Sequence, residues 1–158
     1  MCYAVTMNVE KTIRDYLPRV IHMSLGTSKD NKPWVSELHF VFDERLNLYF
    51  RSKTSHRHSQ EIAENENVAG NIIVQHSVGQ DVRGVYFEGK AKLLTNVDED
   101  HPAYKLYCER FDTNADILKE AGEEHGHKFY RVSVDTFYVF DNQESVPAQK
   151  YELPWLKK

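Results

Sequence analysis

Six segments of the chain are rich in β-branched and aromatic residues, and polar turns or helical stretches separate them. Such segments predict β-strands. In the second segment, alternation places Ser36 and Leu38 on one face of the strand and Glu37 and His39 on the other. The predicted strands cover residues 20–27, 34–42, 46–51, 68–76, 82–94 and 128–140.

Hydrophobic residues recur at helical spacing in four further segments. Asn8 precedes the first of them as a candidate N-cap, and Pro18 follows it as a stop signal. Thr54 and Ser55 are candidate N-caps for the second, because a hydroxyl accepts a hydrogen bond from a free amide of the first turn. The predicted helices cover residues 9–17, 56–65, 98–111 and 116–121.

The order of these elements predicts an antiparallel arrangement. The first three strands follow one another in hairpin order, with Asp30 and Asn31 at the tip of the first turn. A single helix separates the third strand from the fourth. We therefore predict a mainly β fold, a small six-stranded antiparallel barrel with flanking helices, in one domain of residues 1–158. The polar tail after residue 140 is expected to add no strand.

Basic residues gather where the third strand passes into the second helix, and acidic residues follow them. A helix dipole favours the opposite order, so this arrangement is favourable only if an anion lies at the helix start. Free amides, hydroxyls and cationic side chains at a helix N-terminus suit a phosphate group. We interpret the stretch as a phosphate site; the alternative is a solvated basic turn followed by an acidic helix face. The basic residues are Arg51, Lys53, His56, Arg57 and His58, and the acidic ones are Glu61, Glu64 and Glu66.

Composition adds a few exclusions. The 158 residues, 41% of them hydrophobic, are enough for one buried core, and the net charge of −4 argues against a nucleic-acid partner. Cys2 and Cys108 have no metal-binding spacing and predict free thiols in a reducing compartment. No apolar run reaches the roughly 18 residues of a membrane span, and the first ten residues lack a signal-peptide pattern. These features predict a cytoplasmic protein with no membrane partner.

The order of the predicted strands, the turns between them and the basic helix start resembles that in the pyridoxamine-phosphate-oxidase-like family of FMN-binding split barrels. The resemblance covers roughly residues 15–95 and rests on G-T-S-K-D-N-K-P-W-V-S, D-E-R-L-N-L-Y-F, the Ser/Thr-rich turn before Arg57, N-E-N-V-A-G and R-G-V-Y-F-E-G-K-A. It implies a six-stranded split barrel that forms a homodimer, with FMN in the subunit interface.

The resemblance also implies particular cofactor contacts. Arg57 matches the family's usual arginine at the phosphate, and His58 stands where a lysine is common. Gly84 offers only its backbone where relatives often place a glutamine. The implied cofactor-binding residues are Ser36, Glu37, Leu38 and His39 along the isoalloxazine ring, Phe50, Arg51, Ser52 and Lys53 past the ribityl chain, Ser55, His56, Arg57 and His58 at the phosphate, and Arg83 and Gly84 at the polar contact.

Two regions depart from the members that oxidise pyridoxamine phosphate. Those members carry a Ser-Arg-Pro segment and a C-terminal Arg-x-His pair, where this chain reads E-R-F-D-T-N-A-D and Y-E-L-P-W-L-K-K. We therefore expect an FMN-dependent oxidoreductase that acts on a different small molecule, with NADH or NADPH as the candidate electron donor. Two alternatives stay open: a non-catalytic flavin-binding stress or sensor protein, and a relative that binds haem or a deazaflavin.

The sequence assigns no catalytic residue. His39 is either a flavin contact or a histidine at the edge of the core, and Arg83 is either a flavin contact or an interface ion-pair residue. The pairs His56-x-His58 and His125-x-His127 come with no cysteine or carboxylate cluster, so no metal site is expected.

Overall fold

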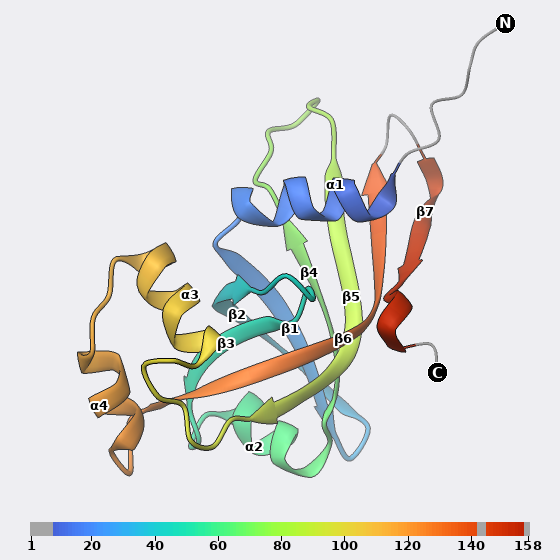
Figure 1. Ribbon diagram of the computed structural model, residues 1–158. Helices are drawn as coiled ribbons and strands as arrows, with labels where there is room; N and C mark the ends of the chain where they lie inside the picture. The colour runs from blue at the N-terminus through green and yellow to red at the C-terminus, as the bar shows by residue number, and fades with distance from the viewer. Residues whose placement is uncertain (1–7, 142–144, 157–158) are drawn as a thin grey trace, which may run out of the picture.

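The computed structural model describes residues 8–141 and 145–156, and a sheet that closes on itself forms its centre (Figure 1). The strands are β1 (His22–Lys29), β2 (Lys32–Phe42), β3 (Leu48–Lys53), β4 (Asn67–Ile73), β5 (Arg83–Leu93), β6 (His127–Asp141) and β7 (Ser145–Glu152). They pair in the order β3-β2-β1-β4-β5-β6-β7, all antiparallel, and β3 also pairs with β6. Strands β1 to β6 therefore form a closed ring, and the predicted split-barrel fold with flanking helices is confirmed.

Alternation along the strands fills the ring with large apolar side chains. Leu25, Phe40, Phe50 and Phe87 are among the residues with essentially no exposed surface. The expected turn between β1 and β2 is present, because Asp30 and Asn31 have φ angles of 50° and 59°. Positive φ at both central residues gives a tight hairpin turn that matches the twist of the strands.

β2 and β3 pair at only three positions, from Phe40–Phe50 to Phe42–Leu48, as β1 and β4 also do. Beyond these pairs β2 continues along β1, and β3 continues along β6. The helix α2 (Arg57–Glu64) follows β3 directly and packs against β1, β2 and β5. It lies at the opposite end of the ring from α1 (Val9–Tyr16) (Figure 1).

Two further helices, α3 (Pro102–Phe111) and α4 (Asp116–Gly122), lie together on one side of the ring (Figure 1). They cover a second apolar cluster on the outer face of β2, β3 and β6. Its buried members are Val41, Tyr49, Ala103, Tyr107, Ile117 and Phe129. The outer side of β3 is therefore covered by helices, and this limits where a ligand can reach that strand.

The structure shows that the expectation for the C-terminal tail was wrong. Residues Ser145–Glu152 form β7 along β6, and Leu153 behind it is buried. The polar composition hid this strand, because an edge strand needs backbone pairing on one side and only a few buried side chains.

The N-caps predicted for α2 and the start predicted for α3 were also wrong. The N-cap of α2 is His56, which makes no side-chain capping bond, and Thr54 and Ser55 lie exposed in the preceding turn. α3 starts at Pro102, with the His101 ring accepting a hydrogen bond from the Ala103 amide at 3.1 Å. Proline suits a first helical position but not a helix interior, so the helix does not extend back to residue 98. The Asn8 cap of α1 is present, at 3.0 Å from the Lys11 amide.

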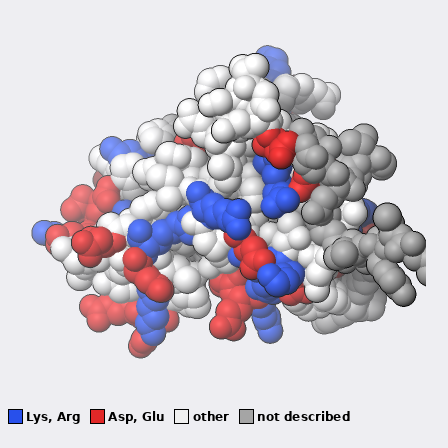
Figure 2. Space-filling model, turned by 90° about the horizontal axis from the view of Figure 1, so that it is seen from above, with Lys and Arg blue, Asp and Glu red and all other residues white. Residues whose placement is uncertain are grey.

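On the face that Figure 2 shows, acidic and basic side chains are interspersed. Within the described ranges no helix is both long and apolar enough to cross a membrane. Cys108 is a free, half-buried thiol. Residues 1–7 lie outside the described residues. They include Cys2 and most of the stretch in which no signal-peptide pattern was found.

Candidate functional site

Three side chains from three elements meet where β2 and β3 part. His58 on α2 lies between Ser36 on β2 and Ser52 on β3. Its Nδ1 is 3.0 Å from the Ser36 hydroxyl, and its Nε2 is 2.6 Å from the Ser52 hydroxyl. The Ser36 hydroxyl also accepts a hydrogen bond from the Trp34 indole N–H at 3.0 Å. His58 therefore bridges the split of the barrel through both of its ring nitrogens.

His58 is only 6% exposed. Burial lowers the pKa of His58, the nearby His56 ring lowers it further, and Glu61 acts in the opposite sense. A neutral imidazole donates from one nitrogen and accepts at the other. One serine hydroxyl therefore gives its proton to His58, while the other receives a proton and keeps its own O–H for a further acceptor.

The polar contacts continue from Ser52 to the outer side of the ring. His56 Nδ1 lies 3.1 Å from the Ser52 hydroxyl, and the His56 ring packs edge-on against His127 on β6. His127 Nδ1 lies 2.5 Å from Glu120 on α4, and Glu120 also binds Arg51 at 2.6 Å. The His127 hydrogen bond, followed by Arg51, lowers the pKa of Glu120 to about 2 although partial burial opposes this.

Arg57, the expected phosphate ligand, lies beside this cluster at the start of α2. Its Nε donates to Glu61 at 2.7 Å, and its guanidinium carbon lies 4.3 Å from the centre of the Trp34 ring. Glu61 is 4% exposed and also accepts a hydrogen bond from the Thr27 hydroxyl at 2.5 Å. The Thr27 bond, and then the Arg57 bond, lower the pKa of Glu61. Glu61 therefore neutralises part of the arginine charge while fixing the guanidinium in place.

The hydrogen-bond donors gathered here are of the chemical types that bind a phosphate group. They comprise a guanidinium with two terminal amino groups beyond its Nε, one spare serine O–H, an exposed imidazole and the first amides of α2, which have no acceptor inside the helix. The net positive charge is modest, because His58 is neutral and Glu61 opposes Arg57. A phosphate group placed here would therefore be held mainly by hydrogen bonds, with a small contribution from net charge.

Several predicted contacts lie elsewhere. Phe50 is fully buried, stacked on Tyr130 at 4.9 Å, so its side chain belongs to the core, and Leu38 packs against the same core. Arg51 points to the outer face, where it pairs with Glu120. Lys53, two residues further along β3, is half-buried, and Ser55 lies exposed in the turn. The alternation along β3 places Ser52 inside the ring and Arg51 and Lys53 outside it.

Glu37 and His39 lie on the exposed face of β2. The Ser24 hydroxyl donates to Glu37 at 2.9 Å. His39 lies between the rings of His22 and Phe111, at 4.5 and 5.2 Å. Burial lowers the pKa of His39, and the neighbouring His22 adds to this. His39 is thus part of an aromatic stack on the outer face of the barrel.

Arg83 and Gly84 lie at the end of β5 that is remote from α2. Arg83 forms an ion pair with the buried Asp141 at 2.5 Å, and its carbonyl accepts a hydrogen bond from the Tyr16 hydroxyl at 2.5 Å. Gly84 packs next to Ile73. β5 spans eleven residues, so within one chain this segment is separated from the Ser36–His58 cluster by roughly the strand's length.

Four residues of the cluster were not predicted as site residues from the sequence: Trp34, Glu61, Glu120 and His127. Glu61 was recognisable, because it stands four residues after Arg57 on the same helix face. Glu120 and His127 are brought to Arg51 and His56 only by the β3–β6 pairing, which leaves no local signal in the sequence. Among the described residues, no group of three or more histidine, cysteine or acidic side chains is arranged to hold a metal ion.

Comparison with known proteins defines the class to which this fold and site belong. The family model described as pyridoxamine 5'-phosphate oxidase matches residues 9–141. This match covers most of the chain, and the chain therefore belongs to the pyridoxamine 5'-phosphate oxidase family.

A relative within this class is the UPF0306 protein PM1958 of Pasteurella multocida. It is 28% identical over 101 residues, which cover 61% of this chain and 67% of that protein. The chain thus spans about two thirds of the length of this curated relative. This similarity agrees with the prediction that the chain is a short member of the family other than the vitamin-pathway oxidase.

Solved structures share the fold at low identity. A haem-binding protein from Mycobacterium smegmatis has a TM-score of 0.72 and 12% identity, over 94% of this chain and 59% of that one. A FAD-binding protein from Mesorhizobium loti has a TM-score of 0.60 and 18% identity, over 83% of this chain and 91% of that one. The same architecture therefore carries different cofactors in different proteins.

Proposed function

We propose that this protein binds FMN at the split between β2 and β3 and acts as an oxidoreductase on a small molecule other than pyridoxamine phosphate. The observation that carries the proposal is the meeting of Ser36, Ser52 and His58 beside Arg57. The family resemblance alone implied these four residues as cofactor contacts, and the fold brings them together from three separate elements.

The chain's own residues would hold the phosphate. Arg57, fixed by Glu61 and Trp34, presents its terminal amino groups, and the free amides of α2 add donors along the helix axis. His58 orients the hydroxyls of Ser36 and Ser52, which is a positioning role because its ring is buried. FMN, when bound, supplies hydride chemistry at its ring. The electron donor we propose is NADH or NADPH.

We further propose that two copies of the chain pair, with the cofactor between them. The outer face of β1, β2, β4 and β5 carries exposed apolar side chains, including Val35 at 65% and Tyr86 at 40%. Small residues separate them, since Gly26 lies opposite both Val35 and Ala69 in the sheet. A face of this composition suits a second copy. In such a dimer, Arg83 and Gly84 of one copy could lie near the Ser36–His58 cluster of the other copy.

An absorbance spectrum of the purified protein tests the proposal, recorded before and after FMN is added and the excess removed. Oxidised-flavin bands that stay with the protein, and that bleach when NADH or NADPH is added without oxygen, support flavin binding and turnover. Retained flavin that neither nucleotide reduces would support a flavin-binding protein without this donor. A haem Soret band, or no retained chromophore, would contradict the FMN assignment.

A further inference from the structure

An unbroken chain of hydrogen bonds runs from the surface to the split of the barrel. The exposed His56 ring lies 3.1 Å from the Ser52 hydroxyl, which lies 2.6 Å from Nε2 of His58. Nδ1 of His58 lies 3.0 Å from the Ser36 hydroxyl, and the Trp34 indole donates to the same oxygen at 3.0 Å. Ser52 and His58 are only 2% and 6% exposed, so the middle of the chain depends on its own members for hydrogen bonds.

The hydrogens of this chain have two possible directions. In the first direction, the Ser36 hydroxyl donates to Nδ1 of His58. Nε2 of His58 then donates to Ser52, and the Ser52 hydroxyl donates to His56. In the second direction each of these bonds is reversed, so that His58 carries its hydrogen on Nδ1 and donates it to Ser36. Both directions satisfy the chain, because a hydroxyl and a neutral imidazole each donate one hydrogen bond and accept another.

The direction decides what Ser36 presents to a ligand. Its oxygen accepts the Trp34 hydrogen bond in both directions. In the first direction its O–H is used by His58, and only a lone pair is left for the ligand, which repels a phosphate oxygen. In the second direction the oxygen accepts from both Trp34 and His58, and the O–H is free to donate to a phosphate. A bound phosphate therefore favours the second direction.

His56 is placed to set the direction. An exposed imidazole takes up a proton more readily than a buried one, and burial lowers the pKa of His58. A charged imidazole has a hydrogen on both nitrogens and accepts no hydrogen bond, so a charged His56 has to donate to Ser52. Among the described residues the Ser52 hydroxyl has hydrogen-bond partners only in the two rings, and it then donates to His58. The second direction follows from this bond.

The charges around His56 leave room for a proton on its ring. The His127 ring of β6 packs edge-on against it at 6.3 Å, and His127 Nδ1 is bound to Glu120. Glu120 is ionised, since the hydrogen bond from His127, followed by Arg51, lowers its pKa to about 2. The cations on the neighbouring segments are Arg51 and Arg57, which are paired with Glu120 and Glu61, and Lys53.

We propose that His56 is a positioning residue whose protonation turns Ser36 from an acceptor into a donor and so couples proton uptake at the surface to phosphate binding at the split. The change takes up one proton from water. This proton binds the Ser36 oxygen, and the hydrogen of each following contact crosses to the other atom of its hydrogen bond until His56 holds the extra proton. The coupling to phosphate rests on the proposed FMN site, whereas the link between His56 and His58 does not.

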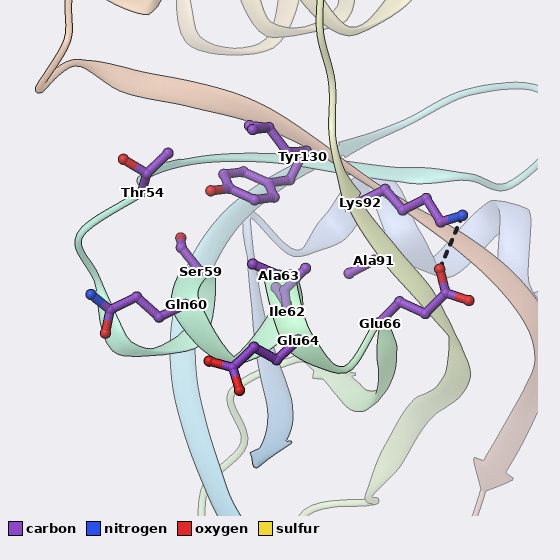
Figure 3. Close-up of a pocket in the computed structure, with 11 residues that line it drawn as sticks. Thr54, Ser59, Gln60, Ile62, Ala63, Glu64, Glu66, Ala91, Lys92 and Tyr130 are labelled. Carbon is purple, nitrogen blue, oxygen red and sulfur yellow. Dashed lines mark ion pairs between the residues drawn. The ribbon is translucent and has the colours of Figure 1, made fainter.

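A neighbouring hydroxyl provides a matched control. Ser59 follows His58 on α2 and is 4% exposed, but its hydroxyl is hydrogen-bonded to that of Tyr130, beside a cavity of about 500 Å³ (Figure 3). Ser59→Ala therefore removes a buried hydroxyl from the same helix and leaves the chain intact. Ser52→Ala breaks the chain and keeps both histidine rings.

The test records the ¹⁵N signals of the histidine rings in NMR spectra of the full chain, because these signals distinguish the two neutral tautomers from each other and from the charged form. Without ligand, the pH is lowered from about 8 to about 5. His58 should shift to the tautomer with its hydrogen on Nδ1 in step with the protonation of His56. Ser59→Ala should show the same shift, and Ser52→Ala should show none. His56→Gln, at an exposed position, cannot take up a proton, and its His58 should keep one tautomer throughout.

FMN tests the coupling to phosphate. At about pH 8 it should shift His58 to the same tautomer, and riboflavin, which lacks the phosphate, should not. A His58 tautomer that stays constant while His56 is protonated, or a shift that persists in Ser52→Ala or His56→Gln, overturns the proposal. No shift with FMN overturns the coupling to phosphate. Flavin bands that the protein then still retains would show that FMN binds away from Ser36, which distinguishes this result from a failure of FMN binding itself.

Discussion

Ser36 on β2 and His58 on α2 lie 3.0 Å apart across the gap where β2 and β3 stop pairing. The contact is one of the few polar links across this gap, and His58 extends it to Ser52 at 2.6 Å. The same histidine thus joins three elements of the barrel and sets the hydroxyls of the proposed phosphate site. Structure and proposed binding therefore depend on one side chain.

Replacing His58 by alanine should destabilise the protein more than it weakens flavin binding directly. The substitution leaves a cavity and removes the partners of two hydroxyls, and we expect the free energy of unfolding to fall by about 2–4 kcal/mol. Chemical denaturation measures this. His58→Gln, which can still donate and accept, should recover part of the loss. A His58→Ala variant as stable as the natural chain would show that the bridge contributes nothing.

Stability should depend on pH through the same residue. Because the pKa of His58 is lowered in the fold, the unfolded chain binds a proton more readily, and stability is fully present above the ordinary histidine pKa of about 6.5. It should decline as the pH falls below that value towards the lowered pKa. The His58→Gln variant should show a flatter profile over this range. His39, whose pKa is also lowered, is present in both proteins and cancels in the comparison.

Glu61→Gln should separate binding from stability. The buried carboxylate accepts bonds from Thr27 and Arg57, and losing its charge should reduce the free energy of unfolding by about 1–3 kcal/mol. The same change removes a negative charge beside the proposed phosphate, so FMN affinity should rise about tenfold. Titration of flavin fluorescence measures the affinity. An unchanged affinity in the folded variant would place the phosphate away from Arg57, whereas a weaker affinity would show that the hold of Glu61 on the guanidinium outweighs the effect of its charge.

A glycine in β5 tests the account of the barrel itself. A Cβ at Gly89 would lie 2.2 Å from the Ser133 carbonyl oxygen, where β5 and β6 shift register. Gly89→Ala should therefore reduce the free energy of unfolding by about 3 kcal/mol or more. Gly122→Ala at the end of α4 is the control, because a Cβ there meets nothing within 4 Å. It should be neutral or stabilising by up to about 1 kcal/mol. Similar stabilities for the two variants would contradict the strand pairing.

Much of the fold was predictable from local signals. The Asp30–Asn31 turn, the Asn8 cap and the six ring strands each depend on residues close together in sequence. β7 was not predictable, because its pairing to β6 is supplied mainly by backbone groups and its composition is polar. The closure of the ring by β3 and β6 likewise joins segments far apart in the chain.

The site was predictable in part, and the limits have physical reasons. The resemblance named Ser36, Ser52, Arg57 and His58, which the fold brings together. It also named Phe50, whose side chain alternation turns into the core, and Arg51, which Glu120 engages on the outer face. β3 is covered on both of its faces. The pattern of apolar and polar residues therefore does not distinguish the face that lines the ring from the face that the helices cover.

The most direct test of the central claim compares the affinities of FMN and riboflavin, which differ only in the phosphate. We predict that the natural chain binds FMN about tenfold to a hundredfold more tightly, as expected for about 1.4–2.8 kcal/mol of charged hydrogen bonds. Arg57→Ala should remove most of this difference and leave riboflavin binding unchanged. Equal affinities for the two flavins, or an undiminished preference for FMN in Arg57→Ala, would contradict a phosphate site at the split between β2 and β3.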